Sequence, residues 1–168
     1  MTMPLTSIIT VYNPDWPAKY EEEAMRVRPV FGDTLLEIHH VGSTAIPELA
    51  AKPEIDILVV VTTVSAAARW TIGLSGYGYT RGRDMSRGHL FYKRNVCGVR
   101  THKIHVCLES HEEIEKMLKF RDYLRSHREV CEEYEALKLK LERENTAGIG
   151  EYLDGKAPFI EGVLSAID

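Results

Sequence analysis

The stretch from Ile55 to Val61 constrains the fold of this chain more than any other part of the sequence. It is almost wholly apolar and rich in β-branched side chains, which suit a pleated, buried surface. A run of this length and composition is typical of a strand in the middle of a sheet whose two faces are both covered. We therefore expect a core built around a central strand at residues 55–61.

Weaker patterns predict the elements around this strand. Strands are expected at 8–12, 35–41, 89–94 and 102–108, and the turn at 95–100 would join the last two into a hairpin. Helices are expected from Trp16 to a point before Pro29, at 66–74, in two segments from Glu112 onward, and at 156–167. Because no linker or repeat divides the chain, we expect residues 1–168 to form a single domain.

Charge, cysteine usage and hydropathy limit the classes of function. The formal net charge of −4 argues against nucleic acid as a partner, because non-specific binding of polyanions requires a basic surface. The 3 cysteines fit neither a disulfide framework nor a paired-cysteine zinc motif, which indicates a reducing compartment. The N-terminus lacks a signal-peptide pattern, and the longest apolar run is too short to span a bilayer. We therefore expect a cytoplasmic protein without a membrane partner.

Two carboxylates lie at the start of the central strand. Because side chains alternate across a strand, Glu54 and Asp56 share one face, with Cα atoms about 6.5–7 Å apart. Carboxylates at this separation can converge on two divalent cations roughly 3.5–4 Å apart, the arrangement of two-metal phosphoryl transfer. Mg²⁺ prefers such hard oxygen ligands. The alternative is that both acids lie at the exposed end of the strand and bind nothing.

A glycine turn precedes the two acids. Val41, Gly42 and Ser43 follow a predicted strand, and the chain from Thr44 onward can open a short helix. Glycine lets a phosphate approach the backbone, both Ser43 and Thr44 carry hydroxyls, and a helix N-terminus favours anions. These residues are candidates for phosphate binding, but a glycine-serine pair alone is most often just a turn.

Taken together, the turn at 42–43, the spacer at 44–53 and the acids at 54–57 resemble the signature of the DNA polymerase beta-like nucleotidyltransferases. The fuller wording, His-Val-Gly-Ser-Thr-Ala-Ile-Pro at 40–47 and Lys-Pro-Glu-Ile-Asp-Ile at 52–57, resembles the GrpB family. Weaker matches extend over nearly the whole chain. The resemblance implies an α/β fold of the α+β type, in which helices back a mixed β-sheet and further helices form the C-terminal part.

The resemblance also implies a reaction. In active members of the superfold, the acids matching Glu54 and Asp56 hold Mg²⁺ on a nucleoside triphosphate, an acceptor hydroxyl attacks the α-phosphate, and pyrophosphate leaves. Gly42 and Ser43 would then hold the β- and γ-phosphates, with Thr44 beside them. Lys52 could neutralise charge near the same site, and its alternative is a solvated surface lysine.

The sequence departs from the family pattern at two points. Glu48 stands where GrpB-like sequences usually have glycine, which alters a turn. The superfold's third carboxylate belongs on the strand at 102–108, where His105 is the candidate for the third metal position. An imidazole suits Mg²⁺ poorly, which shifts the expected ion toward Mn²⁺, Zn²⁺ or Ni²⁺. The alternative is a histidine that is packed and hydrogen-bonded under the helices.

Three functions remain open on these residues. The first is metal-dependent transfer of a nucleotidyl group to a small-molecule acceptor, with Arg87 in the basic loop at 81–88 closing over the polyphosphate or remaining solvated. The second is a non-catalytic nucleotide- or metabolite-binding module linked to coenzyme A or nucleotide metabolism, because GrpB-like domains can occur fused to dephospho-coenzyme A kinase. The third is a hydrolase that uses His105 with Asp56 on a transition metal.

Overall fold

The computed structural model describes residues 4–167, and its centre is a five-stranded mixed sheet. The strands are β1 (Leu35–Val41), β2 (Ile55–Val61), β3 (Tyr79–Arg81), β4 (His89–Val96) and β5 (Val99–Leu108), in the order β1-β2-β5-β4-β3. The β2 and β5 strands are parallel, and the other neighbours are antiparallel. The predicted α/β class with a mixed sheet is thus confirmed; β2 lies inside the sheet between β1 and β5, and β5 is the middle strand.

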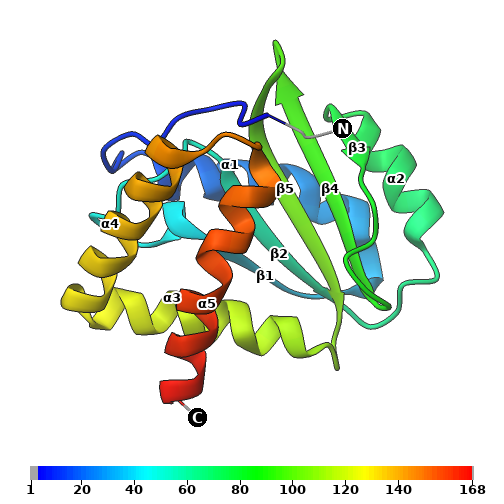
Figure 1. Ribbon diagram of the computed structural model, residues 1–168. Helices are drawn as coiled ribbons and strands as arrows, with labels where there is room; N and C mark the ends of the chain where they lie inside the picture. Colours follow the sequence, from blue (N-terminus) through cyan, green and yellow to red (C-terminus); the bar gives the residue numbers. More distant parts are fainter. Residues whose placement is uncertain (1–3, 168) are drawn as a thin grey trace.

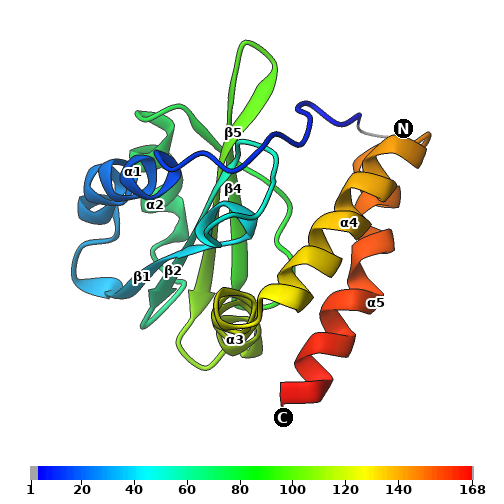
Figure 2. The ribbon, with the colours of Figure 1, turned by 90° about the vertical axis from the view of Figure 1, so that its left-hand side faces the viewer.

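One face of the sheet packs against α1 (Trp16–Phe31) and α2 (Ala67–Ser75), as Figure 2 shows. This face carries the largest apolar cluster, in which Ile57 and Val59 of β2 meet Trp70 of α2 and Phe31 of α1. All four side chains are fully or almost fully buried. Burial of large apolar side chains contributes roughly 1.5–3 kcal/mol each, so this layer holds the sheet in a fixed position.

The other face of the sheet is covered by α3 (Glu112–Ser126), α4 (Arg128–Glu144) and α5 (Ile149–Ile167), visible in Figures 1 and 2. Apolar residues of α3 pack on Leu58 and Val60 of β2. A further cluster joins the three helices to Ile46 and Leu49, which follow the short 3₁₀ helix η2 (Ser43–Ala45). Within the described residues, no helix is long and apolar enough to cross a membrane.

Several predicted boundaries are wrong. The first helix continues through Pro29 to Phe31, because a proline in the last turn removes a single backbone hydrogen bond while buried Val27 and Phe31 hold the turn to the core. Residues 8–12 form only a bridge between Thr10 and Ala51 instead of a strand. The hairpin is longer than expected, since β4 and β5 extend to Val96 and Val99.

The sequence predicts that the last helix begins at residue 156, but α5 begins at Ile149. The glycines near its start lower helix propensity and hide this part of the helix from sequence patterns. Gly155 has a packing reason: a Cβ at this position would lie 2.5 Å from Leu141 Cδ2, so glycine lets α5 approach α4 closely. The expected effect of Glu48 on its turn has a structural basis, since Glu48 has a φ of 67°, in the left-handed region that favours glycine.

Candidate functional site

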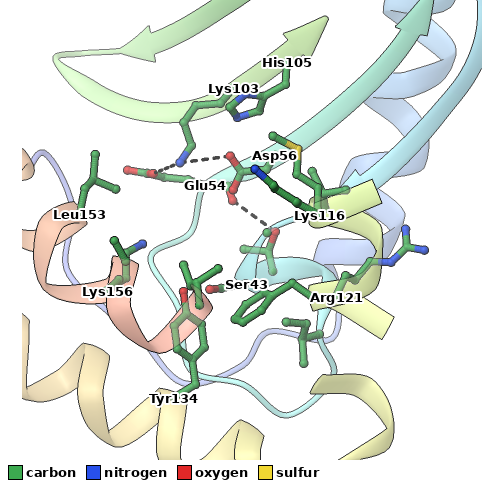
Figure 3. A pocket seen from close by; sticks show the side chains of 18 of the residues that line it. Ser43, Glu54, Asp56, Lys103, His105, Lys116, Arg121, Tyr134, Leu153 and Lys156 are labelled. Carbon is green, nitrogen blue, oxygen red and sulfur yellow. Dashed lines mark hydrogen bonds and ion pairs between the residues drawn. The ribbon is translucent and has the colours of Figure 1, made fainter. Parts of the chain in front are cut away.

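A cleft of about 470 Å³ lies between the sheet face on which α3 packs, the turn at Gly42 and the helices α3, α4 and α5. Figure 3 shows the side chains that converge on it. The cleft brings together most of the residues predicted from the sequence: Gly42, Ser43, Thr44, Lys52, Glu54, Asp56 and His105. Its volume lies within the range of roughly 300–1,000 Å³ that is usual for small-molecule sites.

Glu54 and Asp56 form one side of the cleft, and a lysine lies between them. Asp56 is aligned in the parallel ladder with Lys103 of β5, so both side chains leave the sheet on the same face. The Lys103 Nζ is 3.1 Å from Asp56 Oδ1 and 3.3 Å from Glu54 Oε2. Burial lowers the pKa of Lys103, but the two carboxylates outweigh it and raise the pKa above its ordinary value. The ammonium is therefore a permanent cation at the acid pair.

This arrangement does not fit the two-metal centre expected from the sequence. Such a centre requires hard oxygen donors around a position that a divalent ion can enter. Here the two carboxylates already share the ammonium of Lys103, and β5 contributes Lys103 and His105 to the cleft instead of a third carboxylate. The donor set alone therefore supports an anion-binding cleft better than a preformed magnesium centre.

The turn before the acids is fixed tightly against β2. Gly42 has a φ of 75°, and a Cβ at this position would collide with the Asp56 carboxylate, so the site requires glycine. The Thr44 hydroxyl donates to the backbone oxygen of Glu54 over 3.2 Å and is 2.9 Å from His40 Nε2. Thr44 is 1% exposed, which gives its side chain a role in holding the turn. Ser43 is the hydroxyl that faces the cleft beside Tyr134 (Figure 3).

Lysines from four parts of the chain line the cleft, namely Lys52, Lys103, Lys116 and Lys156. Lys52 and Lys156 both lie over the ring of Tyr152, with Nζ 4.0 and 4.6 Å from its centroid. Burial, followed by repulsion from Lys103 and Lys52, lowers the pKa of Lys156 to about 8. Cations held this close, partly away from water, are suited to binding an anion. The sequence prediction missed all of these except Lys52, because an isolated lysine carries no periodic signal.

His105 lines the cleft but is directed toward another histidine. Its partner in the ladder is Leu58, and its Nδ1 is 2.9 Å from His89 Nε2. Burial, with the positive charge of Lys103, lowers the pKa of His105 to about 3, so the ring is neutral. This matches the packed and hydrogen-bonded alternative more closely than a role as third ligand beside Asp56.

Arg87 is the one predicted site residue that the structure places elsewhere. It is exposed and lines a separate hollow with Gly88, Ser110 and His111. The reason is strand direction: β4 begins at His89, opposite Cys107 near the C-terminal end of β5, whereas Asp56 is aligned with Lys103, four residues earlier on β5. The loop before β4 is therefore at the far end of the sheet from the acids.

The same arrangement of strands and helices occurs in a nucleotidyltransferase. A crystal structure of the Cid1 poly(U) polymerase with Mg and 3′-dATP bound matches this fold with a TM-score of 0.59 and 12% identity. The match covers 88% of this chain and 49% of that one. At such low identity the likeness establishes the fold alone, which is nucleotidyltransferase-like.

The chain belongs to the GrpB family, whose model, described as GrpB protein, matches residues 6–166. A crystal structure of the conserved protein GrpB from Enterococcus faecalis has a TM-score of 0.87 and 31% identity, covering 95% of this chain and 96% of that chain. UPF0157 protein YqkA of Bacillus subtilis is 36% identical over 154 residues, which are 91% of this chain but only 45% of YqkA. A dephospho-CoA kinase of Mycolicibacterium paratuberculosis is 38% identical over 72 residues, 41% of this chain and 18% of the kinase.

Proposed function

We propose that this chain binds a nucleoside triphosphate, or a closely related nucleotide, in the cleft beneath α5. The observation that carries the proposal is the convergence of the Gly42–Ser43 turn with Lys52, Lys116 and Lys156 on one cleft of ligand size. A polyphosphate is the ligand class that such a group of ammonium ions beside a glycine-serine turn would recognise. The fold shared with Cid1, which has been crystallised with magnesium and a nucleotide, supports this choice of ligand.

The cleft offers different surfaces to the two parts of a nucleotide. Phosphates would lie against Ser43 and the ammonium groups of Lys52 and Lys156. The lining also contains apolar side chains, among them Phe120 of α3 and Ile160 of α5, against which a base can be buried. Lys103 would remain on the two carboxylates and keep them from repelling the phosphates.

Equilibrium binding of ATP to purified protein, measured by calorimetry with and without Mg²⁺, tests this proposal. We expect the double variant Lys52→Gln/Lys156→Gln to bind at least about 10-fold more weakly, since each charge-assisted contact is worth roughly 1.5–3 kcal/mol. Lys140→Gln is the matched control, because Lys140 is exposed on α4 and outside the cleft. Equal affinities of the double variant and the control would contradict the proposal.

Transfer of the nucleotidyl group is the second candidate function, and the position of Glu54 and Asp56 beside the glycine turn favours it. Glu54 and Asp56 are the residues that would hold Mg²⁺ or Mn²⁺ in place of Lys103, and the ion would supply charge neutralisation at the phosphates. Pyrophosphate release, measured across a panel of small-molecule acceptors, tests it. We expect Glu54→Gln/Asp56→Asn to abolish turnover; undiminished turnover, or none for the wild type with any acceptor, would exclude it.

A coenzyme A-related ligand is a further form of the binding proposal. The motivation is the relative described as a dephospho-CoA kinase, whose similarity covers 41% of this chain. Coenzyme A carries phosphates on an adenine nucleoside, which the same lysines would recognise. Competition of ATP with coenzyme A and with dephospho-coenzyme A for the cleft would show which ligand binds more tightly. We propose a cytoplasmic location on the basis of the cysteine usage.

A further inference from the structure

A second group of chemically active side chains lies beyond the cleft, at the C-terminal end of β5. His89 begins β4, Cys107 is its cross-strand partner on β5, and His111 precedes the first turn of α3. One donor atom from each of the three residues lies within 4.8 Å of the others. Three separate elements thus bring two imidazoles and a thiol to one point.

The three side chains of this group differ in their exposure to solvent. His89 is 3% exposed and Cys107 is fully buried, whereas His111 is half-buried at the edge of the hollow that also contains Gly88 and Ser110. The group is therefore enclosed on one side by the sheet and α3 and open to solvent on the other. Of the three residues only His111 lines the hollow, so an ion would reach the buried His89 and Cys107 past the His111 ring.

Each histidine has one nitrogen committed to the fold and one available for a ligand. His89 Nε2 is bonded to His105 Nδ1 at 2.9 Å, which leaves its Nδ1. His111 Nδ1 accepts the backbone N–H of Glu113 over 3.1 Å and so caps α3. His111 Nε2 is 2.8 Å from the hydroxyl of Ser86, an exposed residue that a metal could displace.

We propose that His89, Cys107 and His111 bind a single Zn²⁺-type transition-metal ion through Nδ1, Sγ and Nε2. Two imidazoles and one thiolate select such an ion against Mg²⁺ or Ca²⁺, which prefer oxygen. Tetrahedral zinc with these bond lengths separates its donors by roughly 3.4–3.8 Å, so the group needs to contract by about 1 Å. The His111 ring, held by the cap bond and by the exposed Ser86 hydroxyl, is the member that can move.

A water molecule would complete the tetrahedral shell. The set of two histidines and one cysteine with an open fourth position is also found at catalytic zinc centres.

The proposed ion would also act on the cleft through His105. A metal on His89 Nδ1 requires that Nε2 carry the proton, so His89 would donate to His105 Nδ1. His105 would then be held as the tautomer protonated at Nε2. The ion would thereby fix the orientation of one cleft residue without being part of the nucleotide site.

Titration of chelator-treated full-length protein with Co²⁺ tests the proposal. We expect one equivalent to bind, with the visible absorption of tetrahedral Co²⁺ and a thiolate-to-metal charge-transfer band. Cys107→Ser should lose the charge-transfer band, and His111→Gln should weaken binding at least about 100-fold. His111 is half-buried, so its variant keeps the core packing that Cys107→Ser alters. Cys97→Ser, at an exposed cysteine in the hairpin turn, is the matched control.

Competition by Zn²⁺ and thermal unfolding complete the experiment. Zn²⁺ should displace Co²⁺ and raise the unfolding temperature of the wild type, but not that of the His111→Gln variant. Glu54→Gln/Asp56→Asn should keep the full Co²⁺ spectrum, which separates this site from the nucleotide cleft. A wild type whose Co²⁺ affinity and spectrum equal those of His111→Gln would overturn the proposal.

Discussion

At the scale of single residues, the contacts of Lys103 set the net charge on the side of the cleft that Glu54 and Asp56 form. Its ammonium is within 3.3 Å of both Glu54 and Asp56, whose side chains are each only 14% exposed. Two carboxylates this close, without the lysine, would repel each other and bind the next available cation. The presence of Lys103 therefore determines whether the two carboxylates bind a metal ion or are neutralised by an ion pair.

We expect Lys103→Met to raise the affinity of the Glu54–Asp56 pair for divalent ions. The variant keeps most of the aliphatic packing and removes the competing cation, so Mn²⁺ binding should strengthen at least about 10-fold. Electron paramagnetic resonance of free Mn²⁺ measures this directly. Lys116→Met is the control, because Lys116 lines the same cleft but pairs with Glu112 and Glu113 of its own helix. Unchanged Mn²⁺ affinity in Lys103→Met would show that the acids do not form a latent metal site.

Lys156 makes nucleotide binding depend on pH. Burial and nearby lysines lower its pKa to about 8, so it is charged at pH 7 and loses its proton as pH rises through 8. A bound polyanion favours the charged form, hence affinity should fall above pH 8 by up to about tenfold per pH unit. Calorimetry at pH 7.5–9.5 measures this, in a range above the second phosphate pKa of about 6. The nucleotide affinity of Lys156→Arg should depend little on pH. A wild-type affinity that is equally independent of pH would refute the assignment of this dependence to Lys156.

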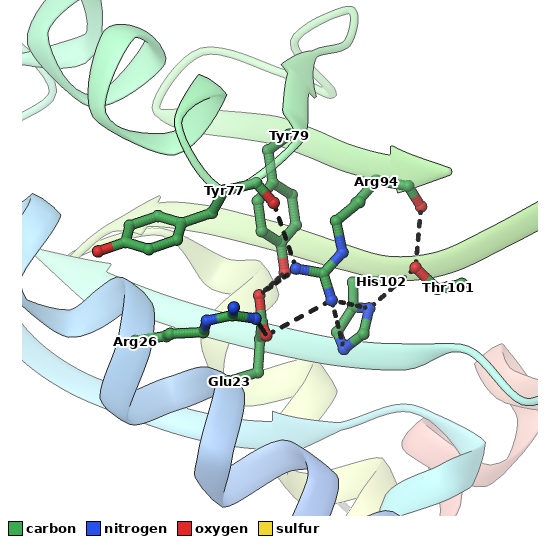
Figure 4. A network of polar contacts seen from close by, with 7 residues as sticks. All are labelled: Glu23, Arg26, Tyr77, Tyr79, Arg94, Thr101 and His102. Atoms are coloured by element: carbon green, nitrogen blue, oxygen red, sulfur yellow. Dashed lines mark hydrogen bonds and ion pairs between the residues drawn. The ribbon is translucent and has the colours of Figure 1, made fainter. Parts of the chain in front are cut away.

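At the scale of secondary-structure elements, a buried polar network joins α1 to three strands (Figure 4). Glu23 of α1 accepts hydrogen bonds from Arg94 of β4 and from Tyr79 of β3, both at 2.8 Å. Arg94 also donates to a ring nitrogen of His102 on β5 over 2.8 Å. Burial raises the pKa of Glu23, but Tyr79 and Arg94 outweigh it and hold that pKa below its ordinary value. The network thus fixes where α1 crosses the sheet.

Breaking this network should strongly destabilise the fold. Glu23 is 3% exposed, so Arg94→Met leaves the buried carboxylate only its 3.3 Å ion pair with the partly exposed Arg26 and should cost up to about 3–5 kcal/mol in the free energy of unfolding. The double variant Glu23→Leu/Arg94→Met removes both charges and should lose less than the sum of the single variants. Urea denaturation of the three variants measures both effects. Strictly additive losses would contradict a coupled pair.

The elements differ in how far local sequence determines them. The bounds of β1 and β2 follow from the residues alone, because an apolar strand between polar turns has few alternatives. The continuation of α1 through Pro29 does not follow from the local sequence, because the tertiary packing of Phe31 outweighs the tendency of proline to end a helix. The same division holds at the site. Strand alternation predicts that Glu54 and Asp56 share a face, but the pairing of Asp56 with Lys103 depends on a register between strands distant in sequence.

At the scale of the whole molecule, two neutral histidines lie where the sheet meets α1. His40 of β1 is stacked on Tyr20 of α1 with ring centroids 4.7 Å apart, and His102 accepts from Arg94 within the polar network. Burial, with nearby arginines, lowers the pKa of each to about 4. Both rings are therefore uncharged in the folded protein near neutral pH, and protonating either would place a cation beside arginine side chains.

These histidines should make the fold sensitive to mild acid. Their pKa is about 6.5 in the unfolded chain and about 4 in the fold, so the unfolded state binds more protons between these values. Stability is then lost as pH falls from 6.5 toward 4, by up to about 1.4 kcal/mol per pH unit for each histidine. Urea denaturation at several pH values measures the slope. His102→Asn should lower the slope while His127→Gln, at an exposed position, should not; equal slopes would mean that His102 is protonated in the folded state.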